Sequence, residues 1–429
     1  MYPIISAPRK IKLQPDYSTI YVNTGRIYVN ESAASILRLC NGTNTPDDII
    51  EQLIIKYDEK PEIVTDFVRE FLDYSLRLGT VTPSASRELA EITVQGNTTY
   101  WTPDAVVLEL THNCPLSCRH CFLDAGHGTS MSKEMLMPLC EEMVTMGVDM
   151  VQLTGGEPLI YPGVDAIIEF FIQRDIRLSI TTSGIVNSPK TNQAIARMKG
   201  TGGWVQVSLD GLEDTHNQMR GNRHGYSSAV AFIQKMIALG IDVDVATTVT
   251  QASFDELEPL CQQLKAWGVR TYRIGVISER GRAIDNGLGS PASLRRMVAE
   301  KRRALKARYD SPRFHVSGFE DDLIGDPHAR QQENCGAGYR ILKISPDGNV
   351  HPCPLMNWPI GSLQDHSLTE ITQRNGKRFA LMLSPSPQQC GTCSNLVFCK
   401  GCMAEALQYC GTVERCNWKT SQAASAGLY

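Results

Sequence analysis

Apolar residues in the middle of the chain follow two alternating periods. From 104 to about 310, six short runs rich in β-branched residues alternate with segments whose apolar residues recur at helical spacing. Such alternation is typical of an α/β fold in which helices cover a parallel sheet. Right-handed crossovers curl that sheet into a partial (β/α)6 TIM-like barrel, whose active site lies at the carboxyl ends of the strands. The predicted strands begin at Ala105, Met150, Arg177, Trp204, Asp242 and Thr271.

The first 90 residues have a different pattern, in which short strands precede helices. Two β-rich runs flank a turn near Thr24–Gly25. Asn30 is the predicted cap of a first helix, and Thr45 caps a second helix with Pro46 at its first position. Three strands or fewer followed by three helices predict a winged-helix-like domain over 1–90.

The third helix of this domain is predicted from about Glu62 to Leu78, because its apolar residues recur at helical spacing. A polar segment at 91–103 follows and is interpreted as a linker to the barrel at 104–310. One face of the predicted helix carries Ile63, Phe67, Phe71 and Tyr74.

Composition and charge exclude several classes of protein. The 429 residues carry a net charge of −4, and no apolar run is long enough to span a membrane or to serve as a signal peptide. We therefore expect a cytoplasmic protein without membrane contact. The densest basic stretch, Arg295 to Arg308, and the acidic run from Glu320 to Asp326 are both interpreted as solvated surface. Nucleic acid is not a predicted partner.

Fourteen cysteines are unusual for such a chain. Clustered cysteines in a long chain without a secretion signal more often bind metal than form disulfides. Three lie within eight residues near position 118, and eight lie between 335 and 416, in a region (311–429) with few periodic helices. Metal ligation is expected to replace much of the hydrophobic core there. The isolated Cys40, Cys140 and Cys261 are predicted to be buried core thiols.

The first cluster of cysteines directly follows the first predicted barrel strand. Cys114, Cys118 and Cys121 have the spacing C-x3-C-x2-C. Three thiolates on one tight loop suit three irons of a [4Fe–4S] cluster and leave the fourth iron open. Zinc is the alternative, but the loop offers no convincing fourth ligand.

This spacing at this place in a barrel resembles the radical SAM superfamily. The resemblance implies that S-adenosylmethionine binds the open iron and is cleaved to a 5′-deoxyadenosyl radical, which takes hydrogen from a substrate. It also implies a set of cofactor-binding residues at successive strand ends, with Arg220 at the cofactor carboxylate and His120 near adenine. The other members of this set are Gly155, Gly156 and Glu157 of a GGEP segment, Ser183, and Ser208 and Asp210 of an SLDG segment.

The C-terminal cysteines resemble the SPASM extension, which holds two auxiliary [4Fe–4S] clusters and would bring the total to three. One departure is that only two residues separate Cys399 from Cys402, where the family usually has three. Cys410 is left as an alternative ligand, and a pair of zinc ribbons is the alternative to iron–sulfur clusters. The resemblance assigns one cluster to Cys390, Cys393, Cys399 and Cys416, and the other to Cys335, Cys353 and Cys402, with a fourth iron that is open or bound by Cys410.

The N-terminal domain resembles the peptide-recognition element of enzymes that modify ribosomally made peptides, whose namesake is the pyrroloquinoline-quinone chaperone PqqD. The resemblance covers most of 17–80 and implies that a leader peptide adds a strand to an exposed sheet edge and packs on the third helix. A DNA-binding winged helix is the alternative, which the scarcity of lysine and arginine disfavours.

Together these features predict a radical SAM peptide maturase. The expected product is an intrapeptide thioether, and the expected reductant is a flavodoxin or ferredoxin. Another crosslink, an epimerisation or a decarboxylation would use the same machinery. Two alternatives of different kinds are a radical SAM enzyme that acts on a protein or small molecule, and a non-enzymatic iron–sulfur or zinc regulator.

Overall fold

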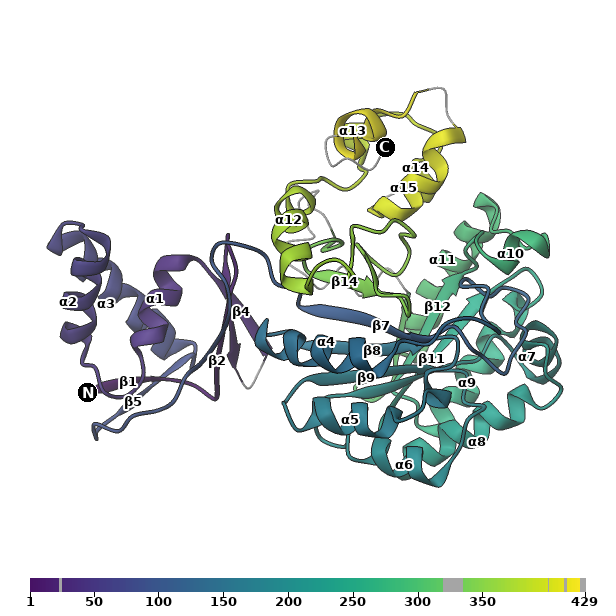
Figure 1. Cartoon of the computed structure of the whole chain (residues 1–429), viewed down its shortest axis with the longest axis horizontal. Coiled ribbons are helices and arrows are strands. Elements are labelled where there is room, and N and C mark those ends of the chain that lie inside the picture. The colour runs from purple at the N-terminus through teal and green to yellow at the C-terminus, as the bar shows by residue number, and fades with distance from the viewer. Residues whose placement is uncertain (23–24, 319–334, 400, 413–414, 425–429) are drawn as a thin grey trace. The chain divides into compact units, whose positions relative to one another are not determined.

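The computed structural model describes residues 1–22, 25–318, 335–399, 401–412 and 415–424 (Figure 1). The chain forms two compact units, Met1–Thr102 with Thr145–Gly147, and Pro103–Val144 with Val148–Tyr429. Thr24 of the predicted turn and the acidic run at 320–326 lie outside the described residues.

The first unit contains more strands than the sequence predicts. β1 (Tyr2–Ile5) pairs with β5 (Val81–Ser84), and a separate four-stranded sheet has the order β4-β3-β2-β6. The prediction of three strands or fewer is therefore wrong, and part of the segment expected to be a linker is a strand, β6. The bounds of this sheet are Pro8–Leu13 (β2), Ser18–Val22 (β3), Gly25–Val29 (β4) and Thr93–Gly96 (β6).

The three helices of this unit begin where the sequence predicts. Asn30 caps α1 (Glu31–Leu39) through its side-chain oxygen, which accepts a hydrogen bond from the Ala33 N–H. Thr45 and Asp48 form a capping box at α2 (Pro46–Tyr57). α3 (Pro61–Arg77) begins with proline.

α3 has a buried apolar side and, next to it, a second apolar row that is largely exposed. Val64, Val68 and Leu72 make the buried side, in a core shared with strands β2 and β3 and helices α1 and α2. The neighbouring apolar row is largely exposed: Ile63 is 54% accessible, Phe67 42% and Tyr74 54%. The helix therefore carries two apolar stripes, and only one of them is buried by other residues in the described part of this unit.

The second unit is built on a ten-stranded sheet with the order β13-β12-β11-β10-β9-β8-β7-β14-β15-β16. All neighbouring pairs from β13 through β7 to β14 are parallel. The six strands predicted for the barrel are confirmed as β7 (Ala105–Thr111), β8 (Met150–Gly155), β9 (Arg177–Thr182), β10 (Trp204–Ser208), β11 (Asp242–Val249) and β12 (Thr271–Val276).

Helices follow these strands and cover one side of the sheet (Figure 1). This is the parallel arrangement that the alternating periods predict. Gly268, with φ 90°, ends α9 in the left-handed region. The helices are α4 (Lys133–Thr145), α5 (Val164–Ile172), α6 (Pro189–Ala196), α7 (Glu213–Arg220), α8 (Gly225–Ala238), α9 (Leu257–Trp267), α10 (Arg282–Asp285) and α11 (Ala292–Tyr309).

Side chains alternate along the central strands between an apolar and a polar set. Leu108, Leu153 and Ile180 are fully buried and belong to the set that packs beneath the helices. The strand register aligns the alternate positions Glu109 with Thr154, and Gln206 with Thr181. The second face of the sheet is therefore polar, as expected of a barrel interior that receives a substrate.

The C-terminal region extends the same sheet. β14 (Ile341–Ile344) pairs in parallel with β7, and β15 (Asn349–His351) and β16 (Gly361–Ser362) continue as antiparallel strands. At the other edge β13 (His315–Gly318) pairs with β12. The remaining helices are short apart from α12, and they are α12 (Leu368–Ala380), α13 (Pro387–Cys390), α14 (Leu396–Cys399) and α15 (Met403–Tyr409).

The structure also bears on the isolated cysteines and on the expected lack of a membrane-spanning segment. Cys40, Cys140 and Cys261 are buried with at most 1% of their surface accessible, as predicted for core thiols. Across the described ranges, no helix combines the length and the apolar character that crossing a bilayer requires.

Candidate active site

The loop that follows β7 is held against the GGEP segment by backbone hydrogen bonds. The N–H groups of Gly156 and Glu157 donate to the carbonyl oxygens of Thr111 and Asn113, at 2.7 and 3.0 Å. A Cβ atom on Gly155 or Gly156 would collide with those same carbonyl oxygens. Glycine is therefore required here because two backbone segments meet without room for a side chain.

Cys114, Cys118 and Cys121 lie on this loop with their thiols near one another. Burial raises the pKa of the Cys114 thiol to about 11, and Cys118 and Cys121 add to that rise. Burial likewise raises the pKa of Cys118. A bound cation would reverse these shifts, because it favours the thiolate. No three His, Cys, Asp or Glu side chains in the described ranges are placed to share a single metal ion.

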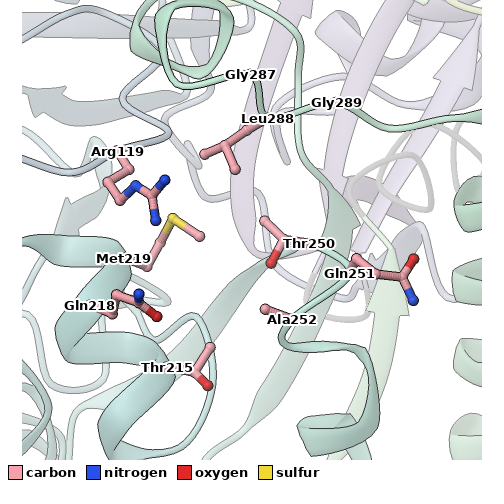
Figure 2. Close-up of a pocket in the computed structure, with 10 residues that line it drawn as sticks. All are labelled: Arg119, Thr215, Gln218, Met219, Thr250, Gln251, Ala252, Gly287, Leu288 and Gly289. Carbon is pink, nitrogen blue, oxygen red and sulfur yellow. The ribbon is translucent and has the colours of Figure 1, made fainter.

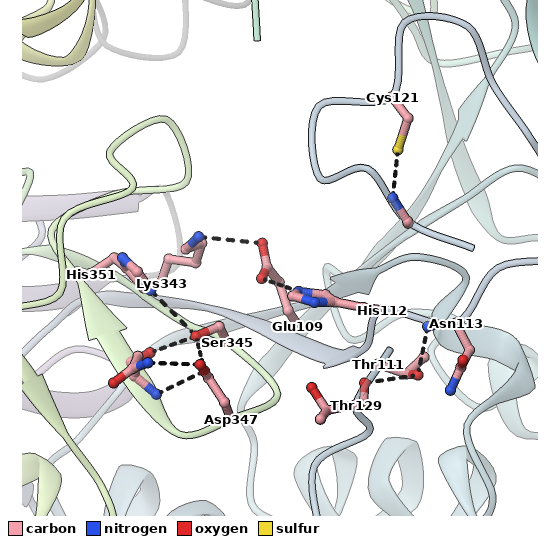
Figure 3. A network of polar contacts seen from close by, with 12 residues as sticks. Glu109, Thr111, His112, Asn113, Cys121, Thr129, Lys343, Ser345, Asp347 and His351 are labelled. Atoms are coloured by element: carbon pink, nitrogen blue, oxygen red, sulfur yellow. Dashed lines mark hydrogen bonds and ion pairs between the residues drawn. The ribbon is translucent and has the colours of Figure 1, made fainter. Parts of the chain in front are cut away.

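These three thiols suit the predicted cluster in the chemistry of their donors. Each accepts one N–H group: Cys114 from the Leu116 backbone, Cys121 from the Ala125 backbone at 3.2 Å (Figure 3), and Cys118 from the Arg220 guanidinium at 3.7 Å. Hydrogen bonds to sulfur are a usual feature of protein sites that hold iron–sulfur clusters. The loop therefore offers one buried and two half-buried thiols, each of which already accepts a hydrogen bond.

A short helix that the sequence analysis did not single out holds the same loop from the other side. The Arg282 backbone N–H donates to the Cys121 carbonyl at 3.0 Å, and its Nε atom donates to the Cys118 carbonyl at 2.9 Å. Asn286 donates to the Arg119 carbonyl at 3.0 Å. Gly281, with φ 53°, precedes this helix, and a Cβ there would collide with the Cys121 carbonyl. The only signal in the sequence is a glycine–arginine pair shortly after the sixth strand.

The carboxylate of Glu157 is buried and joins the ends of β8 and β9. It accepts hydrogen bonds from the Thr182 hydroxyl at 2.7 Å and from the Ser183 hydroxyl at 2.6 Å. The backbone N–H groups of Ser183 and Leu159 also donate to it. Glu157 and Ser183 were predicted as separate cofactor contacts, and the structure brings them into direct contact with each other.

A second buried carboxylate, Asp210, lies just after β10 and gathers three basic side chains. Arg220 Nε lies 2.6 Å from Asp210 Oδ2, an ion pair whose angle is not that of a hydrogen bond. His120 Nε2 lies 3.5 Å from the same oxygen, and the Asp210 backbone N–H donates to His216 at 3.1 Å. Burial alone would raise the pKa of Asp210, but Arg220 and the two histidines outweigh it and hold that pKa at about 2.

Burial also acts on the histidine of this group. It lowers the pKa of His120 to about 4, although Asp210 opposes the shift, so the ring is neutral near pH 7. Its Nδ1 atom is buried and has no hydrogen-bond partner among the described residues. Ser208, the last residue of β10, is half-buried on the polar side of the sheet. The structure therefore groups His120, Asp210 and Arg220 around Cys118.

The C-terminal cysteines separate into two groups. Burial raises the pKa of Cys353 to about 12, with further rises from Cys335 and Cys402. Burial raises the pKa of Cys399 to about 12, with further rises from Cys393, Cys416 and Cys390. The groups are thus three thiols around Cys353 and four around Cys399.

Cys410 lies with the group of four. A small cavity is lined by this thiol together with Cys390, Cys393, Cys399 and Cys416. Burial raises the pKa of Cys402 to about 11, and Cys335 and Glu405 add to that rise against opposing backbone hydrogen bonds. Cys402 therefore belongs with Cys335 and Cys353, whereas Cys410 lines the cavity of the other group.

Polar contacts join the first strand of the barrel to the C-terminal hairpin. Glu109 of β7 lies 3.2 Å from His112 and 3.7 Å from Lys343 of β14, with both the carboxylate and the ammonium groups buried (Figure 3). His351, which pairs with Lys343 across the hairpin, contacts Ser345 at 3.3 Å. His112 lies two residues before Cys114, and His351 lies two residues before Cys353. The ion pair between Glu109 and Lys343 therefore connects the loop that carries Cys114 to the hairpin that precedes Cys353.

Arg280, just before α10, makes a second link between these regions. Its guanidinium donates to Gln408 at 2.8 Å, to the Ala404 carbonyl at 2.9 Å and to the Leu355 carbonyl. A pocket opens next to the cysteine loop, between α7 and the segments after β11 and α10 (Figure 2). It is lined by Arg119, Thr215, Gln218, Met219, Thr250, Gln251, Ala252, Gly287, Leu288 and Gly289.

Three segments of the chain match known protein families. Residues 108–264 match the Radical SAM superfamily, and residues 335–395 match SPASM, an iron–sulfur cluster-binding domain. Residues 18–81 match PqqD, the coenzyme PQQ synthesis protein D. The three matches fall in the order along the chain that the resemblances predict.

Similar proteins include two from Bacillus subtilis. The antilisterial bacteriocin subtilosin biosynthesis protein AlbA is 23% identical over 83% of this chain and 80% of its own length. The sporulation killing factor maturation protein SkfB is 25% identical over 65% of this chain and 67% of its own length.

Among solved structures, SuiB of Streptococcus suis bound to S-adenosylmethionine superposes with a TM-score of 0.66 at 16% sequence identity. The match covers 94% of this chain and 96% of SuiB. The likeness extends over the whole architecture and so supports the arrangement of the parallel sheet and its C-terminal extension. The chain is a radical SAM enzyme that combines a PqqD-like domain, a radical SAM domain and a SPASM iron–sulfur domain.

Proposed function

We propose that this enzyme modifies a ribosomally made precursor peptide by forming a thioether within it. The observation that carries the proposal is the unequal division of the C-terminal cysteines, with three around Cys353 and, once Cys410 is included, five around the cavity at Cys399. A cluster with three cysteine ligands keeps one iron open. That open position is suited to the thiolate of a substrate cysteine.

The radical chemistry belongs to the cysteine loop after β7. Cys114, Cys118 and Cys121 hold a [4Fe–4S] cluster, which, with S-adenosylmethionine and one electron from a flavodoxin or ferredoxin, supplies a hydrogen-abstracting 5′-deoxyadenosyl radical. The Gly155–Gly156 backbone holds the loop in place. Arg220 is assigned to the cofactor carboxylate, and the position of its buried guanidinium beside Cys118 supports that role.

Capture of the peptide is assigned to the first unit. β4 is an edge strand of its sheet in the described residues, and an edge strand is the place where a bound peptide can add a strand to a sheet. The exposed apolar row of α3, with Ile63, Phe67 and Tyr74, offers a surface for the side chains of that strand. AlbA and SkfB, which take part in making subtilosin and the sporulation killing factor, support a peptide substrate.

The atoms and electrons of the proposed reaction balance as follows. A core residue gives one hydrogen atom to the 5′-deoxyadenosyl radical, and the cysteine thiol loses its proton. Bonding of the sulfur to the carbon radical then releases one electron, which an oxidised auxiliary cluster held by Cys335, Cys353 and Cys402 would accept. Two further clusters, one on the group around Cys353 and one on the group around Cys399, bring the proposed total to three.

The test uses the full chain, reconstituted with iron and sulfide under anaerobic conditions, and a precursor peptide encoded next to its gene. We expect iron and sulfide contents near three clusters per chain. The peptide should lose two hydrogens, and one cysteine should become resistant to alkylation. A product that loses two hydrogens while every cysteine stays alkylatable would contradict the thioether and favour a carbon–carbon crosslink.

A further inference from the structure

One of the three thiols on the cysteine loop differs from all other predicted ligand thiols in its hydrogen-bond donor. Cys114 and Cys121 accept backbone N–H groups, which carry no net charge. Cys118 instead accepts from Nη1 of the Arg220 guanidinium at 3.7 Å. Among the ten cysteines predicted to bind iron, the described part of the chain gives a charged donor to Cys118 alone. The first cluster site is therefore asymmetric, with one positively charged corner.

The position of Arg220 is fixed by Asp210. Nε of the guanidinium lies 2.6 Å from the carboxylate, and both side chains are buried, with 11% and 1% of their surface accessible. The carboxylate is in turn held by the Thr248 backbone N–H, which donates to its other oxygen at 3.1 Å. A guanidinium buried this deeply needs a paired anion, and Asp210 supplies it.

The guanidinium joins the two other groups through different nitrogens, with Nη1 toward the Cys118 sulfur and Nε toward the Asp210 carboxylate. His120 Nε2 lies 3.5 Å from the same carboxylate. The positive member of the pair is therefore the one that contacts the sulfur. At a buried site such an oriented pair acts on a neighbouring charge more strongly than at the surface.

We propose that Arg220, held in place by the positioning residue Asp210, raises the reduction potential of the first cluster through its contact with the Cys118 sulfur. The proposal rests on the assignment of Cys114, Cys118 and Cys121 as ligands of that cluster. Reduction adds one negative charge to the cluster, and a positive donor at a ligand sulfur stabilises that charge. The effect requires no cofactor, so it is distinct from any contact of Arg220 with S-adenosylmethionine.

The test is a redox titration of the reconstituted full chain in the absence of S-adenosylmethionine, followed by EPR spectroscopy. The signal of the first cluster is the component that Cys118→Ala removes and that added S-adenosylmethionine perturbs. We expect Arg220→Gln to shift its midpoint to a more negative potential, and Arg220→Lys, which keeps the charge, to shift it less. The matched control is Arg223→Gln, which removes an exposed charge three residues away and should leave the midpoint nearly unchanged.

The role of Asp210 is tested by a double-mutant cycle in the same titration. If Asp210 holds Arg220 at the sulfur, the shift caused by Arg220→Gln will be much smaller when Asp210→Asn is already present. Additive shifts from the two substitutions would overturn the positioning role. An unchanged midpoint in Arg220→Gln, with the cluster loaded, would overturn the proposal as a whole.

A measurement on the unaltered enzyme covers the case in which these variants fail to fold. The chain is produced with arginine labelled with nitrogen-15 in the guanidino group, and the reduced first cluster is examined by pulsed EPR. We expect a weak coupling to guanidino nitrogen, and its absence would contradict the contact. Failure of Cys118→Ala to remove the signal would instead refute the ligand assignment, so the two failures are distinguishable.

Discussion

The carboxylate of Glu157, after β8, accepts hydrogen bonds from both the backbone N–H and the hydroxyl of Ser183, after β9, at 2.9 and 2.6 Å. Two strand ends that the sequence separates by more than twenty residues are thus joined by one buried anion. Ser183→Ala removes one charged hydrogen bond and is expected to cost about 2 kcal/mol of stability. Glu157→Gln is expected to cost more. Both carboxylate oxygens accept hydrogen bonds, and in glutamine an N–H₂ group would replace one of these oxygens and face the donors of its neighbours.

Anaerobic urea unfolding of the two variants measures these costs. Gln193→Ala, which changes an exposed polar residue on α6 after the same strand, is the control. A Glu157→Gln variant as stable as the native chain would show that the carboxylate is not held as the structure describes.

Gly281 offers a test of how the cysteine loop is supported. Gly281→Ala places a Cβ against the Cys121 carbonyl oxygen and also strains a positive φ angle. Gly287→Ala strains a similar φ of 61°, but no atom lies within 4 Å of its Cβ. We expect Gly281→Ala to lower the iron content of the first cluster by at least half, and Gly287→Ala to leave it unchanged. Equal iron contents in the two variants would mean that the loop does not depend on α10.

The exposed row on α3 predicts where the leader peptide binds. Phe67→Ser should weaken leader binding by about tenfold, which corresponds to about 1.4 kcal/mol, while the stability of the chain changes little because the ring is 42% accessible. Ile55→Ser on α2, at a residue that is 82% accessible, is the matched control and should bind the leader normally. Fluorescence anisotropy with a labelled leader peptide measures both. Equal affinities would place the leader elsewhere.

The capping box of α2 predicts a stability difference that depends on pH. Thr45→Ala is expected to cost about 1 kcal/mol, because Thr45 caps the helix. Hydrogen bonds from the Thr45 backbone and hydroxyl lower the pKa of Asp48 below its usual 3.8. A lowered pKa in the folded state contributes stability above pH 3.8 that is lost as the pH falls through the folded value. Asp48→Ala removes this carboxylate, so the stability difference between Asp48→Ala and the native chain, measured by urea unfolding at several pH values, should shrink in acid. A difference that stays constant as the pH falls would contradict the hydrogen bonds to the Asp48 carboxylate.

The local signals in the sequence predict the local structure well. The caps at Asn30 and Thr45 depend on one turn of backbone, and the six barrel strands depend on runs of β-branched residues, so both are visible without a fold. By contrast, β6 is a polar strand that forms only because β2 lies beside it. Its residues carry no strand pattern of their own, and the segment was interpreted as a linker.

In the candidate site, too, features set by neighbouring residues could be predicted, and features set by distant residues could not. The cysteine spacing and the GGEP segment are local and identify the loop. The contacts of Arg282 and Asn286 with that loop join residues more than 160 positions apart, and no periodicity marks them. The outward direction of Phe67 on α3 was equally invisible, since an amphipathic pattern shows that a stripe is apolar and leaves open whether the chain itself covers it.

The central claim is that Cys114, Cys118 and Cys121 hold a cluster that cleaves S-adenosylmethionine. The most direct measurement is the yield of 5′-deoxyadenosine from the anaerobically reconstituted full chain with dithionite and S-adenosylmethionine. We predict that Cys118→Ala abolishes this product, while Cys261→Ala, which removes a buried thiol of α9, retains it. A chain that forms no 5′-deoxyadenosine, or a Cys118→Ala variant that forms as much as the native enzyme, would contradict the account.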